Sequence, residues 1–196
     1  MTLSVEPLTG DALVAALPDL ARLRIEVFRD WPYLYAGTLD YERAYMEKFS
    51  NSTGAVIVAA RDGEKIVGAA TGSPMVGHAD EFAEPFRERG YDIAKLFYCG
   101  ESVLSKAYRG RGIGHAFFEH REAHARRLGG FTHATFCGVV RPPDHWMRPK
   151  DYVPLDAFWT KRGYTKIDGL VGSFEWLDIG ETKKTSKPMQ FWLKAL

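Results

Sequence analysis

The sequence has little cysteine, no excess of charge of either sign and no long apolar run. Only two cysteines occur among 196 residues. Cys99 and Cys137 lie in apolar, strand-like segments, a pattern that fits neither a disulfide framework nor a zinc site. Both are therefore predicted to be reduced core thiols. With 26 basic and 25 acidic residues, the net charge gives no indication of a nucleic-acid or membrane-surface partner.

The N-terminus lacks the basic, apolar and small-residue pattern of a signal peptide, and no stretch is apolar enough for a transmembrane helix. We therefore expect a cytoplasmic protein that binds neither nucleic acid nor a membrane. Apolar residues make up 45% of the chain and charged residues 26%, which is the balance of a globular protein with a buried core. No repeat, low-complexity tract or linker divides the chain, so residues 1–196 are predicted to form one domain.

Hydrophobic periodicity and turn residues predict an alternating series of strands and helices. The predicted strands are Leu3–Leu8, Ala55–Arg61, Lys65–Gly72, Leu96–Leu104, Thr132–Val140, Gly172–Leu177 and Met189–Leu193. The predicted helices are Asp11–Phe28, Leu39–Phe49, Glu81–Arg89, Gly112–Leu128 and Leu155–Arg162, of which Glu81–Arg89 is charged and expected to be exposed. This order of elements indicates a mixed α/β fold.

The most informative segment is Arg109-Gly110-Arg111-Gly112-Ile113-Gly114, which joins a predicted strand to a long helix. Glycines allow a close approach of the backbone, and the N–H groups of the first helical turn and the two arginines favour a bound phosphate. The segment is not a P-loop, because no Gly-Lys-Ser/Thr follows. It is also not a G-x-G-x-x-G motif, because Gly114 comes one residue early. A plain flexible loop is the alternative.

The segment Leu96–Lys166 contains, in order, an acidic residue in a strand, an R-x-x-G-x-G turn, a long helix, a strand and a short helix ending in FWTKRGY. This series of features resembles the GNAT acetyltransferase superfamily. Arg109, Gly112 and Gly114 match the signature that holds the pyrophosphate of acetyl-CoA in this superfamily, and FWTKRGY matches its later motif. The resemblance implies a single α/β (mixed α+β) domain. Its central, mostly antiparallel mixed sheet would splay between the fourth and fifth strands and be flanked by helices.

The resemblance also implies acetyl-CoA as a co-substrate and assigns residues to it. The segment from Arg109 to Gly114 would hold the pyrophosphate, with Gly110, Arg111, Gly112 and Ile113 between its ends. The backbone of Val103 and Leu104 would pair with the pantetheine arm.

Glu101 is the predicted general base. It is the only acidic residue in its apolar strand, where a carboxylate is costly unless it is paired or functional. A structural ion pair with a basic neighbour is the alternative. Trp159 stands where the superfamily commonly has a tyrosine as proton donor, and an indole cannot serve in that role. Tyr152 or water is therefore expected to protonate the leaving thiolate.

The acceptor side is predicted from aromatic residues. Trp31, Tyr33 and Tyr35 lie between the first two predicted helices, a segment that commonly walls the acceptor pocket in this superfamily. Packing between the helices is the alternative for these three. Trp146, in the proline-rich loop after the fifth strand, and the segment from His78 to Phe86 are expected on the same side.

Two histidines and a basic loop allow weaker interpretations. His120 and His124 are four residues apart on a helix, but the sequence is neither H-E-x-x-H nor H-x-x-E-H and shows no third ligand. Both are predicted to pack the helix, and no metal is expected. Arg141, Arg148 and Lys150 could bind a substrate carboxylate, but a solvated basic loop is the preferred interpretation.

These features predict an N-acetyltransferase that moves an acetyl group from acetyl-CoA to the primary amine of a small molecule by direct attack. Three alternatives stay open: a CoA-binding regulatory or partner-binding module without catalysis, a protein or peptide N-acetyltransferase, and, last, a nucleotide-phosphate binder. A homodimer is also open, because the C-terminal strand of this superfamily often pairs between subunits.

Overall fold

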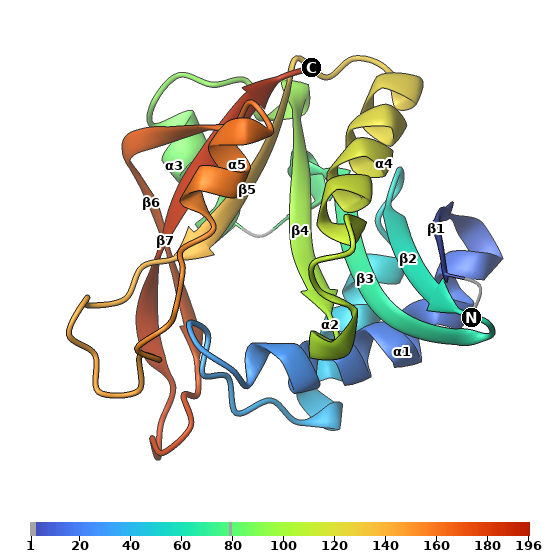
Figure 1. The fold of residues 1–196 in the computed structure, drawn as a ribbon. Coiled ribbons are helices and arrows are strands. Elements are labelled where there is room, and N and C mark those ends of the chain that lie inside the picture. Colours follow the sequence, from blue (N-terminus) through green and yellow to red (C-terminus); the bar gives the residue numbers. More distant parts are fainter. Residues whose placement is uncertain (1–2, 79) are drawn as a thin grey trace.

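The computed structural model describes residues 3–78 and 80–196, which form a seven-stranded mixed sheet with helices on both faces (Figure 1). The strands are β1 (Leu3–Leu8), β2 (Val56–Asp62), β3 (Lys65–Pro74), β4 (Leu96–Leu104), β5 (His133–Val139), β6 (Thr165–Trp176) and β7 (Thr185–Ala195). The helices are α1 (Gly10–Phe28), α2 (Leu39–Ser50), α3 (Asp80–Arg87), α4 (Ile113–Leu128) and α5 (Asp156–Lys161). None of the described helices is both long and apolar enough to cross a membrane.

The strand order is β1-β2-β3-β4-β5-β7-β6, and every neighbouring pair is antiparallel except β4 and β5, which are parallel. The predicted mixed α/β fold with a mostly antiparallel sheet is therefore confirmed. Both cysteines are free, as the sequence predicted.

The central strands divide their side chains between two helical layers. Val56 and Val58 of β2 belong to the core beneath α4, together with Phe117 of that helix. Ile57 belongs to the core beneath α1 and α2, where Leu20 is fully buried. Because successive residues of a strand point to opposite faces, a strand covered on both sides needs a continuous apolar run such as AVIVAA.

Helix α3 is partly buried, so the prediction of an exposed helix was wrong. Ala83 and Phe86 are 1% and 0% exposed, and the ring of Phe86 lies against Tyr91 and Phe191. The charged residues dominate the composition of this segment, but the spacing of its few apolar residues decides which side of the helix is buried.

The two C-terminal strands are longer than the sequence indicated. β6 pairs with β7 from Thr165 onward, but its register shifts between Lys166 and Val171. This irregularity contains Gly169, which has a φ of +67°, and it interrupts the alternation of apolar and polar residues. In β6, the periodic pattern therefore reveals only the regular part that follows this irregularity.

Strands β4 and β5 pair only at their beginnings. The pairing runs from Leu96 with His133 to Tyr98 with Thr135. β4 then continues to Leu104, and the two strands diverge (Figure 1). Beyond the pairing, β4 keeps β3 as its neighbour and β5 keeps β7. The predicted splay is confirmed, and it leaves two facing strand edges whose backbone groups can bind an extended ligand.

A β-bulge in β4 lies within the diverging part. The pairing register shifts between Ala70 and Gly72 of β3, so that Gly100 and Glu101 together oppose Thr71. A bulge of this kind inserts one extra residue into a strand and reverses the faces of the residues that follow.

The bulge decides which face of the sheet carries Glu101. In a regular strand, residues 99 and 101 point to the same face, and Cys99 lies in the core beneath α4. The extra residue instead turns Glu101 to the face covered by α1 and α2, where it contacts Arg24 and Tyr45.

A buried arginine of α4 holds the bulge from the opposite face. Arg121 is 1% exposed. Its Nη1 donates to the carbonyl oxygens of Thr71 at 3.2 Å and Glu101 at 3.4 Å, and its Nε donates to that of Phe117 at 3.2 Å. Because a bulge disrupts the regular ladder, its carbonyl groups need other donors, and the guanidinium supplies them.

A methyl group at position 100 should destabilise the bulge. A Cβ at Gly100 would lie 2.4 Å from Oγ1 of Thr71, so Gly100→Ala is expected to lower the free energy of unfolding by about 1–3 kcal/mol in urea denaturation. In a Thr71→Ala background, the same substitution should cost much less, because the other two nearest atoms, Cβ of residue 71 at 3.7 Å and Cε1 of Tyr98 at 3.9 Å, lie at ordinary van der Waals distance. An equal cost in both backgrounds would contradict the clash as the cause.

Candidate functional site

The glycine-rich turn lies between β4 and the N-terminus of α4, as predicted. Gly110 and Gly112 have φ values of +76° and +80°, in the left-handed region that favours glycine. A Cβ added at either position would meet nothing within 4 Å, so the backbone of the turn is open to a ligand. Gly112 caps α4, and the N–H groups of the first helical turn have no acceptor within the helix.

Two arginines flank this open backbone. Arg109 and Arg111 are both exposed. Nε of Arg109 donates to the carbonyl oxygen of Leu104 at 3.3 Å, and Nη2 of Arg111 donates to that of Ala107 at 3.1 Å. Each guanidinium has five N–H donors, so most of them stay available. Open backbone N–H groups, the positive end of a helix and two guanidinium groups together fit a phosphate or pyrophosphate.

Val103 and Leu104 lie at the end of β4 that has diverged from β5. They pair with Ala69 and Gly68 of β3, so the other edge of β4 faces the opening. The side chain of Val103 is fully buried, and a ligand in the opening would therefore meet backbone rather than side chain. The predicted pairing of these residues with an extended arm stays a prediction.

Glu101 lies in a chain of buried polar groups beneath α1 and α2. Its Oε2 accepts a hydrogen bond from the hydroxyl of Tyr45 at 2.9 Å and lies 3.0 Å from Nη1 of Arg24. Nε of Arg24 donates to Oε2 of Glu42 at 2.6 Å, and Oε1 of Glu42 accepts from the hydroxyl of Tyr35 at 2.7 Å. One guanidinium therefore joins two carboxylates.

One oxygen of Glu101 remains available. Oε1 is buried and accepts no hydrogen bond from the described residues, whereas Oε2 makes both contacts. A buried acceptor without a donor is costly, so this atom is a candidate for contact with a substrate. Burial alone would lower the pKa of Arg24, but the charges of Glu101 and Glu42 raise that pKa above its usual value. Arg24 therefore stays charged at neutral pH.

Three tyrosine hydroxyls surround this part of the sheet. Burial raises the pKa of Tyr33, Tyr45 and Tyr98 above the usual value, and the charge of Glu101 raises that of Tyr45 further. All three therefore remain protonated at neutral pH. The hydroxyl of Tyr98 lies 3.2 Å from Sγ of Cys137 on the diverging strand β5. Burial raises the pKa of this thiol to about 12, so Cys137 is also protonated.

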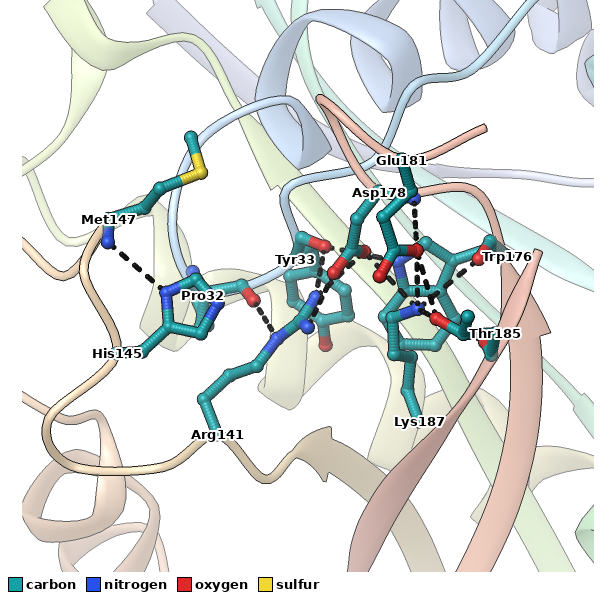
Figure 2. A network of polar contacts seen from close by, with 10 residues as sticks. All are labelled: Pro32, Tyr33, Arg141, His145, Met147, Trp176, Asp178, Glu181, Thr185 and Lys187. Atoms are coloured by element: carbon teal, nitrogen blue, oxygen red, sulfur yellow. Dashed lines mark hydrogen bonds and ion pairs between the residues drawn. The ribbon is translucent and has the colours of Figure 1, made fainter. Parts of the chain in front are cut away.

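Arg141 joins three segments that are far apart in the sequence, and Figure 2 shows its guanidinium between Pro32, Tyr33 and Asp178. Nη1 and Nη2 contact the two carboxylate oxygens of Asp178 at 2.6 and 3.0 Å. Nε donates to the carbonyl oxygen of Pro32 at 2.8 Å, and Nη2 donates to that of Tyr33 at 2.7 Å. The prediction of a solvated basic loop was therefore wrong for Arg141.

Asp178 is shared between two cations. Nζ of Lys187 lies 3.6 Å from Oδ1 of Asp178 and 3.4 Å from Oε2 of Glu181, and it donates to the carbonyl oxygen of Trp176 at 3.3 Å (Figure 2). The loop after β5, the segment between α1 and α2, and the connection from β6 to β7 are therefore tied together by one ionic cluster.

Trp31, which was predicted on the acceptor side, lies close to Tyr152, which was predicted as a proton donor. The ring of Trp31 is 5.1 Å from that of His145 and 5.9 Å from that of Tyr152, measured between centroids. Nε1 of Trp31 is buried and has no hydrogen-bond partner among the described residues. Burial and the charge of Asp156 raise the pKa of Tyr152, so its hydroxyl keeps its proton at neutral pH.

The other predicted acceptor residues lie in different surroundings. Tyr33 packs between Phe28 and Trp176, at 4.4 and 6.1 Å between ring centroids. Tyr35 is 8% exposed, and its hydroxyl donates to a buried carboxylate, which leaves little of its ring for a ligand. Trp146 is 84% exposed. Within the segment from His78 to Phe86, Ala79 lies outside the described residues.

Trp159 has a packing role in the structure. Its ring lies 5.0 Å from that of Phe136 and 5.2 Å from that of Trp192. A Cβ at Gly138 would lie 3.1 Å from the Trp159 ring, so the indole fills the space that this glycine leaves. Trp159 therefore packs against the core, and its indole has no ionisable proton with which it could protonate a thiolate.

His124 packs the helix as predicted. It is 4% exposed, its Nδ1 accepts from Nη2 of Arg127 at 2.7 Å, and its Nε2 therefore donates to the carbonyl oxygen of Gly54 at 3.0 Å. Within residues 3–78 and 80–196, no group of three or more His, Cys, Asp or Glu side chains is placed to hold a metal ion.

The sequence analysis missed Arg24, Tyr45 and Tyr98 as neighbours of Glu101. Arg24 and Tyr45 occur in helices α1 and α2. An arginine or a tyrosine is also common at an exposed helix position, so the residue type alone does not indicate a contact with Glu101. Tyr98 precedes the bulge and therefore shares the face of Glu101 although the two are three residues apart. Only the β-bulge, which is a property of the pairing, reveals this relation.

Comparisons with known proteins agree with this geometry. A family model described as the acetyltransferase (GNAT) family matches residues 20–149. No curated protein gave a significant match. Several solved structures are similar to this chain along its whole length. Their sequence identities are low, so the similarity shows the fold alone.

Three of these structures illustrate the likeness. NAA60 from Arabidopsis thaliana in complex with acetyl-CoA is 15% identical with a TM-score of 0.62, over 100% of this chain and 99% of that chain. Ribosomal-protein-alanine N-acetyltransferase from Brucella melitensis is 14% identical with a TM-score of 0.61, over 98% and 99%. PaiA N-acetyltransferase from Thermoplasma acidophilum in complex with coenzyme A is 11% identical with a TM-score of 0.55, over 100% of both chains.

Removal of the Arg141 charge should destabilise the protein. Arg141→Met leaves two backbone carbonyl groups and part of Asp178 without donors, so the free energy of unfolding in urea should fall by about 3 kcal/mol. Lys150→Met, in the same loop but exposed, should change it by less than about 0.5 kcal/mol. A similar small effect for both variants would show that the ionic cluster adds nothing to stability.

Proposed function

The chain belongs to the acetyltransferase (GNAT) family, and from that premise we propose that it transfers an acetyl group from acetyl-CoA to the primary amine of a small molecule. The observation that carries the proposal is the position of Glu101. The bulge places this carboxylate in the diverging part of β4, with Oε1 free of other contacts. The glycine-rich turn follows at the end of the same strand.

Acetyl-CoA supplies the acyl group, and the residues that would hold it follow from the site. The open backbone from Arg109 to Gly114 fits its pyrophosphate, because both glycine φ values and the exposed guanidinium groups suit a bound diphosphate. The free edge of β4 at Val103 and Leu104 would bind the amide groups of the pantetheine arm as a strand would.

Glu101 would act as the general base. A primary amine is protonated at neutral pH, and it attacks a carbonyl carbon only after it loses a proton. Oε1 of Glu101 would take this proton, directly or through water. The new C–N bond then forms, the C–S bond breaks, and the sulfur leaves as a thiolate. The nitrogen gives its second proton to water, and a proton from water also restores the hydroxyl of the tyrosine that protonates the thiolate. Tyr152, which keeps its proton at neutral pH, is the proposed donor to that thiolate through water.

A small molecule is the preferred acceptor because the contacts of Arg141 hold the segment between α1 and α2 against the loop after β5. Trp31 packs against that same loop. A protein or peptide acceptor is the second candidate, because Trp146 and Val153 in this loop are 84% and 76% exposed and offer an apolar surface. A cytoplasmic location and a homodimer remain predictions.

Release of free CoA in the presence of amines tests the function. Purified protein with acetyl-CoA should release thiol faster when a panel of small primary amines is added, and peptides with free N-termini provide the comparison. CoA should also raise the melting temperature, and Arg109→Ala should reduce this shift. A CoA-dependent shift without amine-dependent thiol release would identify a binding module without catalysis. The absence of both would overturn the proposal.

Glu101→Gln should lower kcat by about a hundredfold and leave the KM for acetyl-CoA unchanged, because an amide cannot accept the amine proton. Glu42→Gln is the matched control, since it removes the other carboxylate that contacts Arg24. It should retain most of the turnover. Equal losses in the two variants would indicate that Glu101 only holds Arg24 in place.

A further inference from the structure

A cavity of about 180 Å³ lies next to Glu101, between α2 and the end of β3. Its walls include Tyr45, Lys48 and Phe49 of α2. Tyr45 also donates its hydroxyl hydrogen bond to Oε2 of Glu101 at 2.9 Å. Tyr45 therefore contacts both the cavity and the predicted base.

The walls of the cavity are largely aromatic. Phe49 and Tyr45 come from α2, and Phe82 comes from α3 on the other side. The ring of Phe82 is fixed by Tyr98 at 5.0 Å and by Phe174 at 4.3 Å, measured between centroids. An apolar cavity of about 150 Å³ can hold benzene. This cavity therefore suits a group of about the size of one ring.

Among the polar side chains that line the cavity, one is charged at neutral pH. Oγ of Ser73 lies 2.7 Å from Nε2 of His78. Burial lowers the pKa of His78 to about 4, although the charge of Glu101 opposes this shift, so the imidazole is uncharged at neutral pH. Lys48 is the one permanently charged residue among the described residues that line the cavity.

The ammonium group of Lys48 has no ionic partner within the part of the chain that the structure describes. Most other cations near the site are neutralised: Arg24 contacts Glu42 and Glu101, and Arg141 contacts Asp178. The cavity therefore has the ammonium group of Lys48 on its wall. Its wall residue Tyr45 binds the carboxylate of Glu101, whose Oε1 accepts no hydrogen bond from the described residues.

We propose that this cavity binds the distal end of the acceptor, and that this end carries a carboxylate. The inference rests on the proposed function and specifies its substrate class. The amine would lie at Glu101, a body of about ring size would lie between Phe49 and Phe82, and the carboxylate would pair with Lys48. An acceptor with this arrangement has opposite charges at its two ends, and each end meets the complementary charge of the protein.

Matched acceptors that differ only in the anion test the inference. The pair para-(aminomethyl)benzoate and its carboxamide has the same ring and the same amine. The wild-type protein should acetylate the carboxylate with a kcat/KM about tenfold higher than the carboxamide. Lys48→Met should remove this preference, and Lys48→Arg should retain most of it. Lys65→Met, at an exposed lysine that begins β3, should leave it unchanged.

Calorimetric binding of the same pair to the CoA-saturated protein separates this inference from the proposed function. Tighter binding of the carboxylate that depends on Lys48 supports the cavity assignment even if no amine is acetylated, an outcome that contradicts only the proposed reaction. Acetylation of both members at equal rates, or a preference that survives in Lys48→Met, overturns the cavity assignment and leaves the proposed reaction intact. Lys48 is exposed, so its variants should fold normally, as circular dichroism can show.

Discussion

The contact between the Arg121 guanidinium and the β-bulge of β4 fixes the geometry on which the whole site depends. A bulge leaves carbonyl groups without ladder partners, and Arg121 binds those of Thr71 and Glu101 from beneath α4. Because the bulge reverses the alternation, Glu101 points away from α4 and toward Arg24 and Tyr45. The helix that begins at the glycine-rich turn therefore also supports the bulge that orients the candidate base.

A second constraint comes from the ionic cluster of Arg141, Asp178 and Lys187. Asp178 lies between Arg141 and Lys187, and these three side chains come from the loop after β5, the connection from β6 to β7, and β7 itself. Buried ion pairs of this type often contribute little net stability, but they restrict the chain to one arrangement. Here the arrangement brings Trp31 and Tyr152 together on one wall.

Sequence patterns predicted the parts of the site that depend on local structure. The turn from Arg109 to Gly114 was found because left-handed backbone favours glycine and because a long apolar periodicity follows it. The family assignment rests on that turn and its neighbours and was confirmed. The orientation of Glu101 and the partner of Arg141 were not found, because both depend on pairing between distant segments. Asp178 follows Arg141 by 37 residues, and no local rule connects them.

Tyr45 belongs to two environments at once, because its ring lines the cavity and its hydroxyl binds Glu101. A substitution there that enlarged the cavity for a bulkier acceptor would also remove a hydrogen bond from the carboxylate of the proposed base. Selection for a new substrate could therefore not replace Tyr45 without also changing the surroundings of the proposed base. Divergence in acceptor preference should instead accumulate at Ser52 and Gly77, which line the cavity and have no hydrogen bond to Glu101 among the described contacts.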